Sequence, residues 1–353
     1  MTDCNCSTPA ILAVGLIVVY FARKYFKGGQ FTENVSARGK VAVVTGSNTG
    51  IGLETVRELN KKGAKVYMLC RSEQRAGAAK EELVKSGCDS SRLIYVNCDL
   101  GTKENIRKCA EKMKQLESHI DILVNNAGVW MGGYEKTKDG HEMTWGTNYL
   151  GPFLLTELLL PLVEKAEEGR IVNVSSLASY YSPALDLASI DDNIDFNAGV
   201  AYTKSKLANV MHARELTRRL RAKGNTTVTV NSLHPGVIAT DLYRDQGAAR
   251  LFLAAASIFL KSWKDGAQTT LYCALSNDLK GVSGQYFSDC ARKAESPLAL
   301  DDLACKQLQY FRGGQFTEHV SAVGKVAVVT GGNTGIGLET VRELNRRGAK
   351  VSI

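Results

Sequence analysis

The chain has 353 residues, 44% hydrophobic and 23% charged, which indicates a folded globular protein and excludes an intrinsically disordered one. Its formal net charge of +8 is spread along the chain without a Lys/Arg-rich block or a zinc-finger spacing, so no nucleic-acid partner is expected. The nine cysteines are an odd number with no CxxC pair, which favours reduced, mostly buried thiols over a disulfide framework or a metal site.

The first feature along the chain is an apolar run. From Cys4 to Ala22 no residue is charged, and a helix of that length would span about 28 Å, close to a bilayer core. Basic residues follow the run and only Asp3 precedes it, which is the reverse of a cleavable signal peptide. Residues 1–25 are therefore predicted to be a membrane anchor that leaves the rest of the chain in the cytosol. A buried or interfacial helix is the alternative.

From residue 38 to about residue 310, apolar stretches alternate with amphipathic ones. Strands are predicted in KVAVVTG, AKVYMLCR, RLIYVNCDL, IDILVNNAG, GRIVNVSS, TVTVNSLHPG and GQYF, with helical patterns between them. Nearly continuous Val, Ile and Leu indicates a parallel sheet covered on both faces. Right-handed crossovers then predict a doubly wound, Rossmann-type, three-layer α/β/α fold forming a single catalytic domain, residues 38–310.

The first predicted strand leads into a glycine-rich loop, TGSNTGIG, that precedes a helical pattern. Glycines permit a sharp turn and the close approach of a pyrophosphate, and the helix N-terminus offers free N–H groups to its oxygens. A tight turn without a ligand is the alternative. The predicted dinucleotide-binding residues are Gly46, Ser47, Asn48, Thr49, Gly50, Ile51 and Gly52.

The end of the second predicted strand indicates which dinucleotide this is. Sites that prefer NAD place an acidic residue there for the ribose 2′-OH, whereas this chain has Cys70 and Arg71. The guanidinium of Arg71 can pair with a 2′-phosphate. A solvated surface arginine is the alternative for Arg71, but the missing acid favours NADP(H) as the cofactor in either case.

The sequence YTKSK places Tyr202 and Lys206 four positions apart, on one face of a predicted helix. A free tyrosine keeps its proton to about pH 10, and a nearby ammonium stabilises the phenolate. Tyr202 could then exchange a proton with an alcohol oxygen while hydride moves to or from a nicotinamide. Ser176, at the end of a neighbouring strand, would offer its hydroxyl to the same oxygen.

Five short motifs occur along the chain in the order TGxxxGxG, NNAG, NVSS, YxxxK and HPG. With these motifs, the chain resembles the short-chain dehydrogenase/reductase family over about residues 38–290. The resemblance makes Ser176, Tyr202, Lys206 and Asn148 the catalytic group, with Asn148 holding a water that relays protons to the lysine. His234 of HPG is expected to pack or bond locally. The cofactor contacts implied by the resemblance are Asp99, Leu100, Asn126, Ala127, Gly128, Tyr202, Lys206, Pro235, Gly236, Val237 and Thr240.

Ser176 and Tyr202 are 26 positions apart, so a long loop would lie near the substrate mouth. The chain resembles the membrane-bound, NADP-linked retinol dehydrogenase branch of this family in four features. These are the long loop, the stretches GAQTTLYCAL and GQYFSDC, and the N-terminal anchor. The resemblance implies retinal or another lipophilic aldehyde, ketone or alcohol as the substrate, with reduction as the direction. An endoplasmic-reticulum location with the catalytic domain facing the cytosol is expected, and a homodimer is a further hypothesis that the sequence does not decide.

Other interpretations stay open at this point. A steroid or other carbonyl reductase of the same family is one alternative, and a catalytically silent NADP-binding scaffold or sensor is another. The apolar residues 248–263 fit an oily lid, a segment that dips into a bilayer, or an ordinary buried helix.

The last feature of the chain repeats an earlier one. Residues 311–353 match residues 26–68 with eight differences in 43 positions, and end two residues after Val351, inside what would be a second strand. A strand, a helix and half a strand cannot complete a sheet or bury their apolar faces. The segment is predicted to be a partial tandem duplicate, from a genuine duplication or a faulty gene model, that does not fold independently and binds no cofactor.

Overall fold

The computed structural model describes Arg23, residues 27–187, 189–238 and 260–310, and the short stretches 326–328, 341, 344–345 and 350–352. The chain divides into two units, Met1–Gly313 and Gly314–Ile353, which are treated separately below. Nearly all of the predicted anchor lies outside the described residues, as do Thr240 and the apolar residues 248–259. No helix within the described stretches is both long and apolar enough to cross a membrane.

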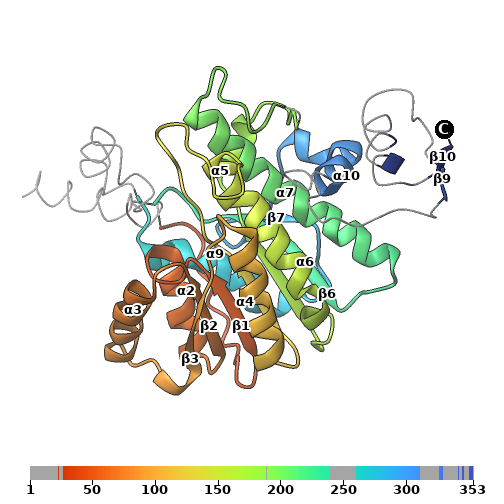
Figure 1. The fold of residues 1–353 in the computed structure, drawn as a ribbon. Coiled ribbons are helices and arrows are strands. Elements are labelled where there is room, and N and C mark those ends of the chain that lie inside the picture. Colours follow the sequence, from red (N-terminus) through yellow and green to blue (C-terminus); the bar gives the residue numbers. More distant parts are fainter. Residues whose placement is uncertain are drawn as a thin grey trace, which may run out of the picture. The chain divides into compact units, whose positions relative to one another are not determined.

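The first unit is built around one sheet of eight strands, in the order β3-β2-β1-β4-β5-β6-β7-β8 (Figure 1). The strands are β1 (Val41–Thr45), β2 (Lys65–Cys70), β3 (Leu93–Asn97), β4 (Ile122–Asn125), β5 (Gly169–Val174), β6 (Val228–His234), β7 (Tyr286–Ser288) and β8 (Ala291–Lys293). All neighbouring pairs from β3 to β7 are parallel, and the order reverses its direction on the two sides of β1. The predicted doubly wound parallel sheet is confirmed.

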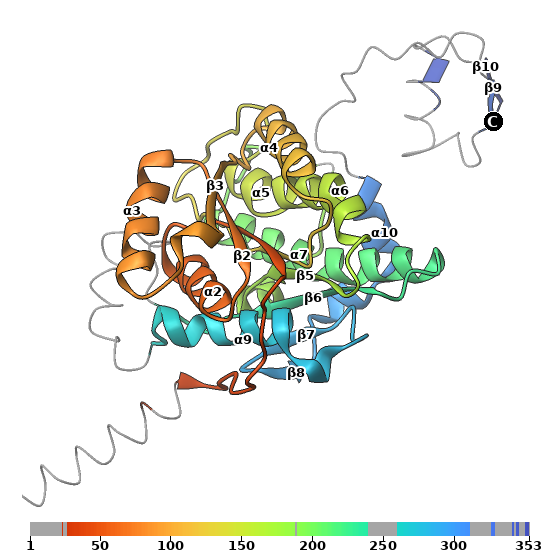
Figure 2. The ribbon, with the colours of Figure 1, turned by 90° about the horizontal axis from the view of Figure 1, so that it is seen from below.

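Helices cover both faces of this sheet (Figures 1 and 2). The helices are α2 (Gly50–Lys61), α3 (Glu73–Lys85), α4 (Lys103–Leu116), α5 (Met143–Trp145), α6 (Gly151–Val163), α7 (Ala198–Ala222), α9 (Trp263–Leu275) and α10 (Asp302–Tyr310), with the shorter turns η1 (Ser90–Arg92), η2 (Gly146–Leu150), η3 (Leu177–Tyr181), η6 (Asn277–Leu279) and η7 (Pro297–Leu300). Apolar side chains of α2, α3 and α9 share one core with the sheet, and those of α4, α6 and α7 share another. Every residue of β1 is buried, because both of its faces are covered.

The edge of the sheet differs from the prediction. β8, which the sequence did not reveal, pairs antiparallel with β7 through a two-residue turn at Asp289 and Cys290. Both turn residues have a φ of +54°, as a type I′ hairpin turn requires. The residues of β8 are exposed, so the strand has no buried apolar face that could mark it in the sequence.

The segment that precedes β1 packs along α9. The N–H of Phe31 donates to Oε1 of Gln268 at 3.2 Å, and the Phe31 ring meets Tyr272 edge to face with centroids 6.3 Å apart. The carboxylate of Glu33 accepts the N–H of Asn277, just beyond α9, at 3.0 Å. These contacts therefore fix the position of residues 31–33 beside α9, before the chain enters β1.

The second unit contains one pair of short strands among its described residues, β9 (Val326–Val328) and β10 (Lys350–Ser352). They are parallel, with Val326 opposite Lys350. In the first unit Val41 lies opposite Lys65 in the same way, and these two residues are the counterparts of Val326 and Lys350 in the sequence repeat. The repeat thus preserves the local strand register.

Candidate active site

The glycine-rich loop joins β1 to α2 at the carboxyl end of the sheet. Gly46 has a φ of +63°, and a Cβ added to it would lie 2.8 Å from the Cα of Ala127. A Cβ on Gly52 would overlap the carbonyl oxygen of Gly46, so neither position has room for a side chain. At Gly50, by contrast, nothing lies within 4 Å of an added Cβ, and the first turn of α2 has no acidic residue. The start of α2 is therefore open and favourable to an anion.

The NNAG turn after β4 is hydrogen-bonded to this loop. Oγ1 of Thr45 accepts the backbone N–H groups of Asn126 and Ala127, each at 3.0 Å. The Asn126 amide donates in return to the carbonyl oxygen of Thr45 at 2.9 Å. These bonds hold the predicted cofactor residues Asn126 and Ala127 against the end of β1, where the glycine-rich loop begins. The rest of the loop has Ser47 fully buried, with Asn48, Thr49 and Ile51 half-buried.

The end of β2 carries a thiol where a carboxylate would favour NAD. The Sγ of Cys70 lies 3.1 Å from Oγ of Ser47, in the glycine loop. Cys70 is buried, and burial raises the pKa of its thiol, so the group stays neutral at physiological pH. Arg71 follows and is exposed. Beyond β3, Oδ1 of Asp99 accepts the N–H of Gly101 at 3.0 Å, and Leu100 is buried.

Tyr202 and Lys206 lie together on α7. The Nζ of Lys206 is 5.6 Å from the centroid of the Tyr202 ring and donates to the carbonyl oxygen of Val174 at 3.1 Å. Lys206 is 4% exposed, and burial lowers its pKa to about 8. The sequence did not single out Trp130, whose indole stacks on the Tyr202 ring with centroids 5.0 Å apart and planes 12° apart. In the sequence, Trp130 stands two residues after NNAG, and this position could have marked it as a residue near the site.

Asn148 lies in the π-helical turn η2, between α5 and α6. Its Oδ1 accepts the N–H of Val129 at 2.7 Å, and its Nδ2 donates to the carbonyl oxygen of Val129 at 2.9 Å. Nδ2 also donates to Oγ of Ser205, on α7, at 3.1 Å. A Cβ added to Gly128 would lie 3.4 Å from the Nζ of Lys206 and 3.5 Å from Oδ1 of Asn148. The NNAG turn, η2 and α7 therefore meet at one place.

Ser176 follows β5, where its backbone is held from three sides. Its carbonyl oxygen accepts the hydroxyls of Ser179 at 2.8 Å and of Tyr286 at 3.3 Å. The next N–H, that of Leu177, donates to Nδ1 of His234 at 3.1 Å. Burial lowers the pKa of His234 to about 4, so the ring is neutral and can accept this bond. His234 thus bonds within the fold, as expected.

The loop after β6 lies beside the same edge of the sheet. Gly236 has a φ of +100°, and an added Cβ would overlap the side chain of Lys261. Pro235 is buried, whereas Val237 is 51% exposed. Thr240, the last predicted cofactor contact, lies outside the described residues.

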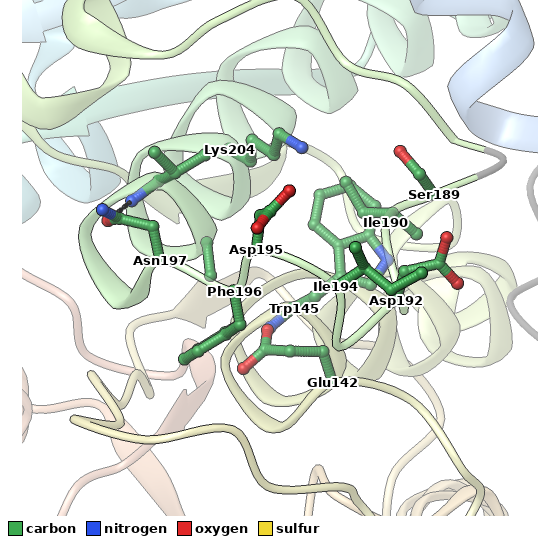
Figure 3. A pocket seen from close by; sticks show the side chains of 12 residues that line it. Glu142, Trp145, Ser189, Ile190, Asp192, Ile194, Asp195, Phe196, Asn197 and Lys204 are labelled. Atoms are coloured by element: carbon green, nitrogen blue, oxygen red, sulfur yellow. Dashed lines mark hydrogen bonds between the residues drawn. The ribbon is translucent and has the colours of Figure 1, made fainter.

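A cavity of about 340 Å³ lies between the start of α7 and residues 189–197 (Figure 3). Trp145, Ile190, Phe196 and Lys204 are among its lining residues. At about 100° per helical residue, Lys204 lies about 160° around α7 from both Tyr202 and Lys206. The cavity is therefore on the other side of α7 from the Tyr202 ring and is not the place where Tyr202 would act.

The thiols do not form a reactive cluster in the described stretches. The described cysteines are free and all except Cys290 are buried, so the prediction that the thiols are mostly buried is confirmed for this part of the chain. No group of three or more His, Cys, Asp or Glu side chains in the same stretches could hold a metal ion.

Comparisons with known proteins agree with this geometry. The family model for short chain dehydrogenases matches residues 40–250. Human retinol dehydrogenase 12 is 41% identical over 309 residues, covering 84% of this chain and 96% of that protein. The Brassica napus protein "Short-chain dehydrogenase TIC 32 B, chloroplastic" is 38% identical over 290 residues, covering 79% and 89%.

A solved structure also matches most of this chain. The crystal structure of an uncharacterized protein from Mycobacterium paratuberculosis matches with a TM-score of 0.64 and 28% identity, covering 80% of this chain and 98% of that one. The family model matches more than half of the chain, and the relatives align along most of their own length. The chain belongs to the short-chain dehydrogenase family of oxidoreductases, which bind nicotinamide cofactors.

Proposed function

We propose that this protein is an NADP(H)-dependent oxidoreductase that interconverts a lipophilic alcohol and its aldehyde or ketone, with retinol and retinal as the preferred pair. The observation that carries the proposal is the buried Lys206 ammonium beside the Tyr202 ring. The retinol dehydrogenases among the relatives support the choice of substrate.

The residues at the sheet edge fit a dinucleotide. The backbone around Gly50 is open, and the N-terminus of α2 can bind the pyrophosphate. Arg71 would pair with the 2′-phosphate, close to Ser47 and Cys70. The further contacts proposed are Gly46, Asn48, Thr49, Ile51, Gly52, Asp99, Leu100, Asn126, Ala127, Gly128, Pro235, Gly236, Val237 and Thr240. When bound, the nicotinamide supplies or accepts the hydride.

The proton would move through the side chains of α7. During reduction, the Tyr202 hydroxyl gives its proton to the substrate oxygen, and the Lys206 ammonium stabilises the phenolate that remains. Ser176 donates a hydrogen bond to the same oxygen. Asn148 holds a water that returns a proton towards Lys206. Trp130 restricts the Tyr202 ring through the stacking contact.

The surroundings of the site favour an apolar substrate. Leu177, adjacent to Ser176, is 44% exposed, and Val237, adjacent to Gly236, is 51% exposed. Tyr181, at the end of η3, is 75% exposed. Exposed apolar side chains beside a reaction site are typical of a mouth that receives a lipophilic molecule.

A membrane would be the source of such a substrate, and we propose residues 1–25 as the anchor to the endoplasmic reticulum, with the catalytic domain, residues 38–310, in the cytosol. An added Cβ on Gly28 would lie 2.6 Å from the Nζ of Lys261, and Lys261 forms a β-bridge with Ile238. Gly28, shortly after the proposed anchor, therefore lies near Ile238 and Lys261, on either side of residues 239–259, which supports a single membrane-facing side. We also propose that the protein forms a homodimer.

A reductase for steroids or other carbonyl compounds is the second candidate, because a relative of comparable identity is named as a chloroplastic short-chain dehydrogenase. A catalytically silent NADP-binding scaffold would keep the glycine loop but show no turnover. A panel of retinal, steroid ketones and simple aldehydes separates these functions.

The test is the loss of NADPH absorbance with retinal, compared between the wild type and Tyr202→Phe. Loss of the proposed proton donor should lower kcat by at least about 100-fold. Tyr272→Phe removes the same atom from α9 and is the matched control, expected to behave as wild type. Full turnover by Tyr202→Phe would refute the mechanism, and NADPH binding without turnover across the panel would favour the scaffold.

A further inference from the structure

A single aspartate ties the long loop after Ser176 to the opposite wall of the site. Oδ2 of Asp191 lies 2.7 Å from Nδ1 of His141, and Oδ1 accepts the N–H of Glu142 at 2.8 Å. The backbone carbonyl oxygen of Asp191 accepts the Tyr134 hydroxyl at 2.7 Å. His141 is 4% exposed, so one of these bonds is shielded from water and correspondingly strong.

Each of the two segments joined in this way is connected along the chain to the surroundings of Tyr202. The loop follows η3 and runs from residue 182 to Asn197, whose side chain caps α7 by accepting the N–H of Val200 at 3.0 Å. The opposite segment begins at Trp130, which stacks on Tyr202, and leads to α5. The loop therefore ends at α7, the helix that carries Tyr202. The opposite segment begins beside Tyr202 and ends at α5.

The start of α5 depends on the same junction. The carboxylate of Glu142 accepts the N–H groups of Thr144 at 2.8 Å and Trp145 at 2.6 Å, which caps this helix. α5 continues into η2, where Asn148 is bonded to Val129. A displacement of Glu142 would thus shift α5 and, because η2 continues directly from α5, would also move Asn148.

The middle of the loop is partly packed, because Ile190 belongs to a buried apolar cluster and Leu185 and Leu187 pack against it. The cavity shown in Figure 3 lies between the loop and α7, and Ile194, on its wall, is 84% exposed. Ile190 is buried and Phe196 contacts Tyr134 edge to face with centroids 5.4 Å apart. Because the cavity leaves part of the loop unpacked, the two side-chain bonds of Asp191, to His141 and Glu142, contribute to its attachment, and Asp191→Ala would remove both.

We propose that Asp191 is a positioning residue that holds the loop of residues 182–197 against the segment of residues 130–142, and so shapes the site for long substrates. It touches neither substrate nor cofactor. A short aldehyde needs only the groups around Tyr202, whereas a long molecule would also extend along the loop. The inference rests on the proposed function, because it specifies how that site selects substrate length.

The experiment compares Asp191→Ala and Asp191→Asn with the control Asp192→Asn, which removes a charge from the adjacent exposed position on the cavity wall. KM and kcat are measured for retinal and for a short aliphatic aldehyde, together with NADPH affinity and thermal stability. Asp191→Ala should raise KM for retinal about tenfold, the size expected for lost charge-assisted bonds. KM for the short aldehyde and NADPH affinity should change less than twofold, and Asp191→Asn should fall between.

Two results would overturn the inference. Retinal KM could remain at the wild-type value in Asp191→Ala, or both substrates and NADPH could lose affinity alike with a lower melting temperature, as a general structural role predicts. Limited proteolysis gives an independent readout, since Asp191→Ala should be cleaved within residues 182–197 faster than Asp192→Asn. A wild type that reduces no carbonyl compound would reject the proposed function as well, whereas normal wild-type turnover with unchanged variants rejects this inference alone.

Discussion

Lys206 holds its ammonium group where water is excluded, 4% exposed, with the carbonyl oxygen of Val174 as an acceptor at 3.1 Å. Burial disfavours the charged form, and the pKa of Lys206 falls from 10.5 to about 8. Between these values the unfolded chain binds more protons, so this residue makes the folded state more stable as pH rises from about 8 to about 10.5. The proposed role beside Tyr202 requires the ammonium, the form that the fold disfavours.

This conflict predicts a pH-dependent affinity for NADPH. If the bound cofactor interacts with the ammonium, binding above pH 8 must first protonate Lys206, and the dissociation constant should rise about tenfold per pH unit. Fluorescence titration of NADPH from pH 7 to 9.5 measures this. Lys206→Arg, whose charge is fixed, should give a flat profile over the same range. A flat wild-type profile would contradict the proposed role of Lys206.

At the residue scale, we propose that Cys70 sets the choice between NADP(H) and NAD(H). A carboxylate at this position, beside Ser47, would accept a ribose 2′-OH and repel a 2′-phosphate. Cys70→Asp should therefore shift the ratio of kcat/KM for NADPH over NADH towards NADH by at least about tenfold. Cys70→Ser keeps a neutral side chain of similar size and should retain the wild-type ratio. An unchanged ratio in Cys70→Asp would remove the argument from the missing acid.

At the scale of elements, α7 connects the site to the rest of the first unit. One side of the helix carries Tyr202 and Lys206, while Lys204 lines the cavity on the other. Further along, Leu207 and Met211 share a buried cluster with Leu308 of α10. α10 thus packs against the helix that carries the candidate site, although nothing in the sequence of α10 marks that role.

The strands were predictable because their chemistry is local. Both faces of β1 to β6 are covered by helices, so these strands have apolar runs that stand out in one dimension. Tyr202 and Lys206 were predictable for the same reason, since their spacing alone puts them on one helix face. The exposed strand β8 carries no such pattern.

What the sequence could not show are contacts between distant positions. Trp130 and Tyr202 are 72 positions apart, and His141 and Asp191 are 50 apart. A tryptophan or an aspartate in a loop has many ordinary uses, and only the folded chain determines which partner it meets. The site could therefore be predicted in its groups, but not in the side chains that hold those groups in place.

At the scale of the whole molecule, one sequence occurs twice in different surroundings. In the first unit β1 lies between β2 and β4, and α2, α3 and α9 cover one face. In the second unit the described strands β9 and β10 pair only with each other. The same residues thus form the same local register in both places, but only the first unit shows neighbours that could hold a cofactor loop.

We therefore expect residues 311–353 to contribute neither activity nor stability. A two-stranded pair is marginal in water, so a nonspecific protease under native conditions should digest this segment first and leave a resistant core that includes residues 38–310. A variant without residues 311–353 should match the full chain in kcat/KM within about twofold and in melting temperature within about 2 °C, as expected if the segment is only marginally folded by itself. Mass spectrometry of the resistant fragment and calorimetry of both proteins measure these outcomes. Equal protease resistance of the two parts, or a clearly lower melting temperature in the shortened chain, would show that the repeat packs as part of the folded enzyme.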